Sequence, residues 1–286
     1  MERCCNSIVD HWSDILRALS PDASQMNPFL PTTLILSLAL IYSAGVLRQI
    51  LWKKRIWNLW RLASFWFGTA LIIFAVTPLH QNDHHTFYHH MQQHLLIGMV
   101  APTFLVMAAP ISLLLRNLPR RGAKACVQFL HSRIIRLWCH PITALVLNFG
   151  GMLVLYLTPL YRSSLHQPWS HHFIHLHFLL AGYLFAWSMA GPDPAPSRPG
   201  FRDRLSILLL AMAIHGISSK LMYIHLFPYA TPHSQADIQA AAQLMYYGGD
   251  LAELLIAILL FAAWRKHIGQ RAEASSYPAS LAPGDP

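Results

Sequence analysis

The sequence has little charge and few cysteines, and it lacks the short motifs of the common enzyme classes. Asp, Glu, Lys and Arg make up 12% of the 286 residues, about half the roughly 25% of an ordinary soluble domain. None of the four cysteines belongs to a Cys-x-x-Cys pair, and no phosphate-binding glycine loop, nucleophile elbow or His-Glu-x-x-His sequence occurs. Thiol-exchange, nucleotide-dependent and hydrolytic chemistry have no motif to support them, and we expect that the protein is not an enzyme.

Long apolar runs take the place of charge. Hydrophobic residues make up 54% of the chain, and seven runs have about the 20 residues that an α-helix needs to cross a bilayer. We predict an all-α polytopic membrane bundle with seven transmembrane helices: residues 28–267 form it, 1–27 are an extracytoplasmic tail and 268–286 a disordered cytoplasmic tail. The predicted spans are Phe29–Leu47, Trp60–Leu79, His94–Leu115, Pro141–Leu160, His172–Met189, Leu205–Phe227 and Ala240–Trp264.

Lysine and arginine predict the orientation of these spans. They gather between spans one and two, between spans three and four, before span six and after span seven, whereas the other connections are nearly free of them. By the positive-inside rule the basic segments face the cytoplasm, so we expect the N-terminus outside and the C-terminus inside. The formal net charge of +9 is then a topology signal. The expected partner is the lipid bilayer, and no binding of nucleic acid is expected.

Histidine is concentrated on the predicted outer side. The chain has 18 histidines, and six of them lie within residues 80–94. If these segments are helical, His90 and His94 stand one turn apart on one face, as do His171 and His175. Imidazole is the commonest metal ligand and also titrates near neutral pH, so both a metal site and a proton-sensitive site are open.

The spacing favours the metal site. Two histidine pairs entering neighbouring spans at the same depth offer four nitrogens to one ion. Met91 and Met245 lie near the same boundary, with Gln93 as a supporting polar group. Thioether combined with imidazole suits Cu(I) better than Mg²⁺ or Ca²⁺, so copper is the predicted metal.

Four ionisable residues lie deep within the predicted spans, where such groups are costly and often functional. Counted from the outer ends of spans six and seven, Lys220 matches Asp250 in depth and His215 matches Glu253. Two interpretations stay open. The pairs lock two helices together, or they form a polar path that leads inward from the histidines.

The run HHMQQHLLIGMVAPTFLVMAAPISLLLRNLP, residues 89–119, resembles the signature of the polytopic CtaG-type cytochrome c oxidase assembly factors. HPITALVLNF, GPDP and ADIQAAAQLMYYGGDLAELL agree with it in order, and the similarity covers about residues 30–266. The resemblance implies a bacterial inner-membrane protein that matures a haem-copper oxidase and handles copper. It puts weight on His90, Gln93, His94, His175, Asp237 and Met245, with His171 as the partner of His175. The chain departs from many relatives in having Tyr246 and Tyr247 where they have tryptophan.

The sequence-based hypothesis is an assembly factor that holds copper in an outer histidine cluster and passes it to an oxidase subunit or to another assembly factor. Asp237 is expected to steer an imidazole as a carboxylate behind the ligands. Two alternatives are a copper or proton transporter, which uses the polar path, and a b-type haem protein with axial histidines.

Overall fold

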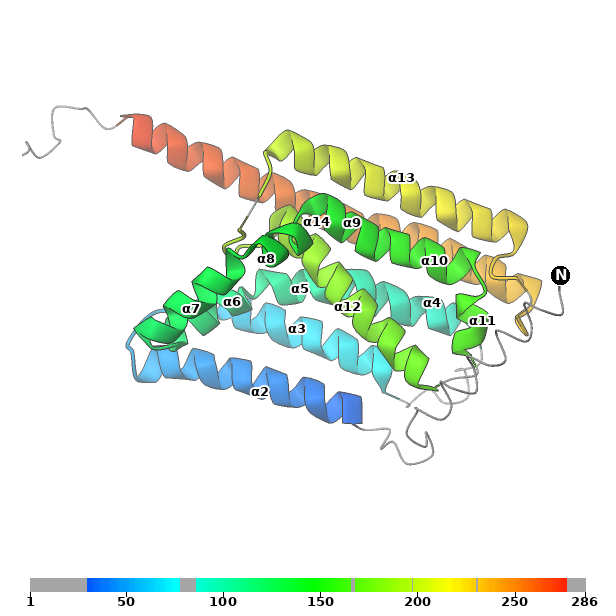
Figure 1. Ribbon diagram of the computed structural model, residues 1–286, viewed down its shortest axis with the longest axis horizontal. Helices are drawn as coiled ribbons and strands as arrows, with labels where there is room; N and C mark the ends of the chain where they lie inside the picture. The colour runs from blue at the N-terminus through cyan, green and yellow to red at the C-terminus, as the bar shows by residue number, and fades with distance from the viewer. Residues whose placement is uncertain (1–29, 78–85, 166–167, 197, 230, 277–286) are drawn as a thin grey trace, which may run out of the picture.

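The computed structural model describes residues 30–77, 86–165, 168–196, 198–229 and 231–276, and every regular element in them is helical (Figure 1). The all-α prediction is confirmed. The tail 1–27 and His80, His84 and His85 lie outside the described residues. The elements are α2 (Leu30–Leu51), α3 (Leu59–Val76), α4 (Phe87–Leu95), η3 (Leu96–Val100), α5 (Ala101–Met107), α6 (Pro110–Asn117), α7 (Arg120–Leu130), α8 (Arg133–Trp138), α9 (Pro141–Leu145), η4 (Val146–Gly150), α10 (Gly151–Leu157), α11 (Leu160–Ser164), α12 (Pro168–Ala190), α13 (Phe201–His225) and α14 (Gln235–Ser276).

By length and apolar composition, five helices of the described residues can cross a membrane: α2, α3, α12, α13 and α14. A sixth crossing is formed if Phe87–Met107 and Pro110–Asn117, which are bent by 42° to each other, count as one broken span. Pro141–Leu157 is a shorter apolar helix. The architecture is that of a multi-pass membrane protein, while the count of seven spans and the orientation of the termini stay predictions.

The broken span bends because its backbone leaves the helix at Ala109. This residue has a left-handed conformation with φ 54°, and Pro110 follows it. Asp193, in the loop after α12, caps the helix that restarts there: its carboxylate accepts hydrogen bonds from the backbone N–H groups of Ile111 and Ser112 at 2.9 and 2.8 Å. The GPDP motif therefore supplies the acceptor for two N–H groups that a helix start leaves without a partner.

We expect Asp193→Ala to destabilise the protein by about 2 kcal/mol, because Asp193 is buried and its loss leaves two N–H groups without an acceptor. Thermal unfolding of the purified protein in detergent measures the effect. Asp193→Asn keeps one side-chain oxygen and is expected to lose less. An unfolding temperature that is unchanged in the alanine variant contradicts this role of the carboxylate.

Two π-helical turns interrupt the central helices. In η3 the N–H of Ala101 reaches back to the carbonyl of Leu96, and the second π-helical turn, η4, interrupts the apolar helix Pro141–Leu157. A π turn inserts one extra residue into a helix, and such turns are frequent at functional sites. The turn η3 alters the helical register directly after α4, and both π turns pack against α12.

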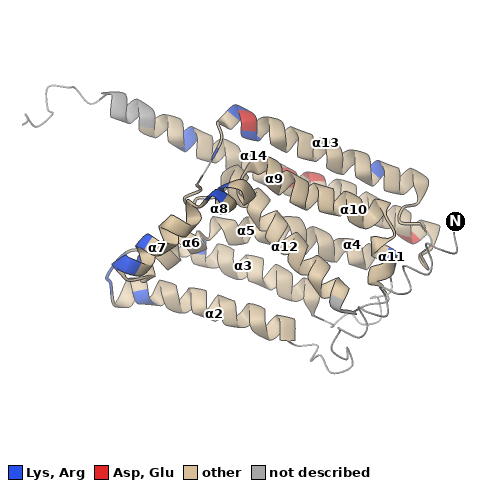
Figure 2. Cartoon of the chain, viewed as in Figure 1, with Lys and Arg blue, Asp and Glu red and all other residues tan. Residues whose placement is uncertain are grey.

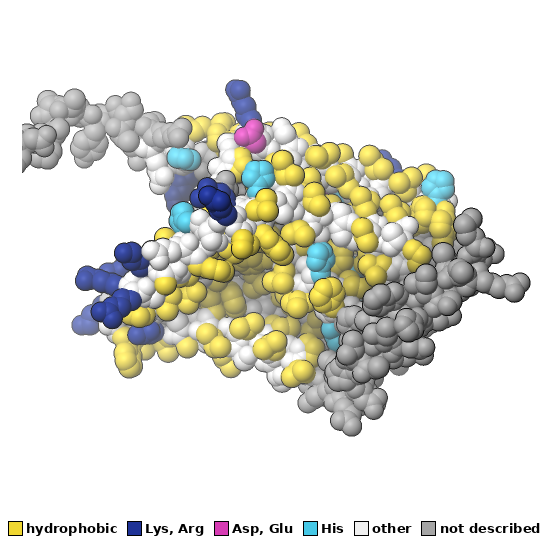
Figure 3. Space-filling model, in the orientation of Figure 1, with side chains coloured by type: hydrophobic (Ala, Val, Ile, Leu, Met, Phe, Trp, Pro, Cys, Tyr) yellow, Lys and Arg dark blue, Asp and Glu magenta, His cyan; other side chains and the backbone are white. Residues whose placement is uncertain are grey.

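Opposite ends of the bundle differ in chemistry. Lys and Arg gather where α2 ends, around α6 and α7, and at the start of α13 (Figure 2). The N-terminal turns of α4 and α12 lie at the other end (Figure 1), and these two helices carry histidines. Between the ends, apolar side chains cover much of the visible face (Figure 3), and Leu38, Leu40 and Ile41 of α2 are more than half exposed. Such a surface suits lipid.

Helix α14 continues to Ser276, so residues 268–276 are helical although the sequence predicted a disordered tail from residue 268. Residues 277–286 lie outside the described part of the chain. An Ala- and Ser-rich composition is typical of disordered tails, but alanine is also the best helix former.

Candidate metal centre

Two helix starts bring the histidines together. Helix α4 begins after Thr86, whose hydroxyl accepts a hydrogen bond from the N–H of His89. It carries His90 and, one turn later, His94 on one face, and α12 carries His171 and His175 in its first turns. Because α12 packs along the helix that contains α4, the two pairs face each other.

Three of these imidazoles form a cluster. His90, His171 and His175 each offer one ring nitrogen, and the three nitrogens lie within 4.8 Å of one another. His90 and His175 are only 7% and 8% exposed, and their Nε2 atoms are buried with no hydrogen-bond partner. A buried polar atom without a partner is costly and requires an explanation, such as a bound ion. We call these three residues the histidine cluster.

His94 lies beside the cluster. Its ring centroid is 4.2 Å from that of His90 and 5.3 Å from that of His175. Its Nε2 atom is also buried without a hydrogen-bond partner. The structure thus brings all four predicted histidines together, with three in ligating geometry and His94 on the side that leads into the bundle.

A second layer of polar residues stands behind His90. The Tyr161 ring lies 4.7 Å from the His90 ring, and its hydroxyl is 2.9 Å from Nε2 of His233. Nδ1 of His233 lies 3.5 Å from the Asp237 carboxylate. Burial, and then the Asp237 charge, raise the pKa of Tyr161. The two ring nitrogens of His233 thus face the Tyr161 hydroxyl and the Asp237 carboxylate.

Asp237 also fixes the start of α4. Its two carboxylate oxygens accept hydrogen bonds from the N–H groups of Phe87 and Tyr88 at 2.6 and 3.0 Å. The predicted second-layer carboxylate is thus present, but it approaches His233 and positions the helix that carries His90. Sequence reasoning passed over Tyr161 and His233. The spacing of His233 and Asp237, one helical turn apart, was the available signal.

A comparison with known protein families shows which family the chain belongs to. The family model of the cytochrome c oxidase caa3 assembly factors (Caa3_CtaG) matches residues 40–267. The chain belongs to this family. The resemblance seen in the sequence is therefore confirmed.

The relatives of this chain include larger mycobacterial proteins. An uncharacterized protein of Mycobacterium bovis is 34% identical over 188 residues, which are 62% of this chain and 28% of that protein. An uncharacterized protein of Mycobacterium leprae is 25% identical over 257 residues, 82% of this chain and 39% of that protein. The chain thus spans well under half the length of these relatives. No solved structure matches it.

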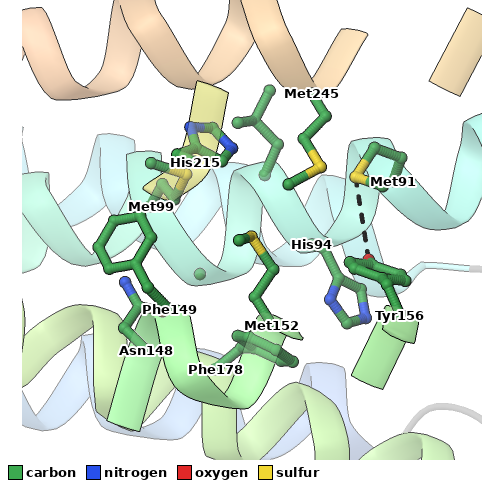
Figure 4. A pocket seen from close by; sticks show the side chains of 12 residues that line it. Met91, His94, Met99, Asn148, Phe149, Met152, Tyr156, Phe178, His215 and Met245 are labelled. Carbon is green, nitrogen blue, oxygen red and sulfur yellow. Dashed lines mark hydrogen bonds between the residues drawn. The ribbon is translucent and has the colours of Figure 1, made fainter. Parts of the chain in front are cut away.

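Three other predicted site residues lie outside the histidine cluster. Met91 and Met245 line an adjacent cavity that His94 also lines (Figure 4). Gln93 donates from Nε2 to the backbone carbonyl of Ala75 at 2.8 Å, so it ties α4 to α3. Met91 and Met245 as ligands of the ion, and Gln93 as a supporting group, stay predictions.

The structure forms one of the two predicted pairs in the deep polar path. Nδ1 of His215 lies 3.6 Å from Oε1 of Glu253, and both side chains are buried. Lys220 is exposed, and its ammonium lies 5.3 Å from the Tyr246 ring centroid. Among the described residues, Lys220 and Asp250 form no ion pair. The predicted Lys220–Asp250 pair is wrong because equal depth in two helices does not mean that the side chains face each other.

Proposed function

We propose that this assembly factor binds a copper ion in the histidine cluster and delivers it to a subunit of a caa3-type cytochrome c oxidase, directly or through another assembly factor. One observation carries the proposal. Three imidazole nitrogens from two helices lie within 4.8 Å of one another, and the Nε2 atoms of His90 and His175 have no other partner. Family membership supplies the oxidase as the recipient.

The size and chemistry of the cluster support copper over haem. Neutral imidazole binds copper strongly among the divalent first-row metals. A haem would need room for a porphyrin beside the ligands, whereas the cavity next to the cluster holds about 40 Å³, little more than the space of a water molecule. Tyr161 and Phe87 fill the other side, with ring centroids 4.7 and 6.1 Å from that of His90. A b-type haem would have to displace them.

The position of the cluster suits delivery outside the cytoplasm. It lies at the end of the bundle opposite most of the described Lys and Arg residues (Figure 2), and the positive-inside rule assigns that basic end to the cytoplasm. The membrane is then the bacterial plasma membrane. His171 is only partly buried, whereas His90 and His175 are buried. An ion in the cluster is therefore reached from the side of His171, where a ligand of the recipient replaces an imidazole.

The proposal is tested in a strain that lacks the protein. We expect the oxidase of this strain to accumulate with less copper than the wild-type oxidase, and the wild-type chain to restore the copper content. Purified oxidase is analysed for copper and haem separately. An oxidase that lacks haem but contains its full copper would show that the assembly role of this family member is not copper delivery.

We expect Asp237→Ala to weaken copper binding by about 10-fold to 100-fold, the usual loss when the group behind a metal ligand is removed. The change removes the acceptor for the Phe87 and Tyr88 N–H groups, so the start of α4 and His90 lose their fixed position. Affinity is measured by titration against a competing chelator. Asp203→Ala, at an exposed position in the first turn of α13, is the control. Equal affinity in both variants contradicts the role of Asp237.

Transport of copper or protons is the second candidate, and the buried His215–Glu253 contact favours it. His215 lines the same cavity as His94, so polar groups follow one another inward from the cluster. Uptake by proteoliposomes that contain the purified chain tests transport. Loss of uptake on Glu253→Gln, with uptake retained on Asp250→Asn, supports a path through Glu253. The absence of uptake by the wild-type chain leaves delivery as the function.

A further inference from the structure

A small cavity lies directly below the histidine cluster. It has a volume of about 40 Å³ and is lined by four methionines, by His94 and His215, by Asn148 and Tyr156, and by apolar groups. The methionines are Met91, Met99, Met152 and Met245. They come from four elements, α4, η3, α10 and α14, and Figure 4 shows the side chains of Met91, Met152 and Met245 directed toward one another across the cavity. We call this space the methionine cavity.

The two π-helical turns contribute to the cavity wall. Gly98 and Met99 belong to η3, and Asn148 and Phe149 belong to η4, and all four residues line the cavity. Close-packed protein interiors leave few voids larger than a water molecule. The extra residue in each turn shifts the side chains that follow it out of α-helical register. The cavity therefore lies where two central helices both depart from regular geometry.

The lining is chemically selective. Thioether sulfur is a soft, neutral ligand that suits Cu(I), whereas Mg²⁺ and Ca²⁺ require oxygen ligands. No carboxylate lines the cavity, so a divalent ion would have no charge to neutralise it there. The Tyr156 hydroxyl donates to the sulfur of Met91 at 3.8 Å, which fixes the direction of one thioether. Met189 and Met222 are also buried in the apolar core but do not line the cavity.

His94 connects the cavity with the cluster. Its ring contacts that of His90 at 4.2 Å between centroids, and the same ring lines the methionine cavity (Figure 4). Its Nε2 atom is buried without a hydrogen-bond partner. The His94 imidazole is thus within reach of both sets of ligands. Among the described residues, it alone contacts the His90 ring, lines the cavity and has a buried ring nitrogen without a hydrogen-bond partner.

We propose that the methionine cavity is a second copper station, specific for Cu(I), and that His94 transfers the ion between it and the histidine cluster. This inference rests on copper binding as proposed above. Transfer takes place by exchange of neutral ligands, imidazole for thioether, so no electron or proton moves. The protein then stores reduced copper in the methionine cavity and presents it through the histidine cluster when a recipient docks.

The experiment counts Cu(I) ions bound to the purified full chain in detergent, under anaerobic conditions, by competition with a chromophoric Cu(I) chelator. We expect the wild-type chain to bind two equivalents. Met152→Leu combined with Met245→Leu, which keeps side-chain volume, is expected to lose one equivalent and to keep the other. The matched control is Met189→Leu combined with Met222→Leu, which is expected to keep both equivalents.

X-ray absorption of the Cu(I)-loaded wild-type chain gives a second readout that needs no variant. We expect both nitrogen and sulfur neighbours around copper. A single equivalent with nitrogen neighbours alone overturns the methionine station and leaves the histidine site standing. A chain that binds no copper under any condition overturns both proposals. Two equivalents retained in the Met152→Leu, Met245→Leu variant, without sulfur in the spectrum, also overturn the station.

Discussion

Replacement of His90 and His175 together by alanine is expected to abolish copper binding at the histidine cluster and to reduce oxidase activity to the level of a strain without the protein. The two changes remove two of the three nitrogens that lie within 4.8 Å of one another, and the remaining His171 cannot hold an ion alone. Copper bound to the purified variant is measured by metal analysis, and oxidase activity is measured in membranes of the complemented strain.

The control for this experiment is His172→Ala. His172 is on the same turn of α12 as His171 and His175 but is exposed and does not belong to the cluster. Its loss is therefore expected to leave the copper content and the oxidase activity unchanged. The unfolding temperature of each variant separates a lost ligand from a lost fold. Wild-type copper content in the double variant, together with normal respiration, would rule out the histidine cluster as the delivery site.

The sequence predicted the cluster because helical spacing places residues four apart on one face. His90 with His94 and His171 with His175 are such pairs, and histidine was segregated to one end of the predicted bundle. Spacing within a helix does not show which neighbour that face meets, since each helix can rotate about its own axis. Met91 was therefore grouped with its neighbour His90, although the two side chains leave α4 in different directions.

Equal depth in two spans predicted the contact of one pair of ionisable residues correctly and that of the other pair wrongly. His215 and Glu253 lie at equal depth and face each other, while Lys220 turns outward and contacts Tyr246. The π-helical turns η3 and η4 were outside the reach of sequence reasoning, because the 3.6-residue period assumes regular helices. The methionine cavity depends on these turns. It could be found only once the helices were placed side by side.

Helices α12 and η3 are in close contact at Gly182. Gly182→Ala is therefore expected to destabilise the protein by about 3 kcal/mol and to weaken copper binding strongly. A Cβ atom at Gly182 would collide with the backbone carbonyl of Gly98 and would lie 3.2 Å from Cγ of Pro102. Backbone atoms cannot rotate away as a side chain can, so the helix itself must move. Thermal unfolding and copper titration of the purified variant measure the two effects.

The segment that faces Gly182 is part of the broken helix and explains why a glycine is needed here. Pro102 has no N–H to donate to the Gly98 carbonyl, and small residues let helices approach closely in membranes. Displacing α12 would carry His171 and His175 away from His90, so stability and metal affinity are expected to fall together. Gly150→Ala is the control, since its added Cβ meets only Cγ1 of Val146 at 3.7 Å, an ordinary contact. If Gly182→Ala binds copper and unfolds like the Gly150→Ala protein, α12 does not hold the histidine cluster through this contact.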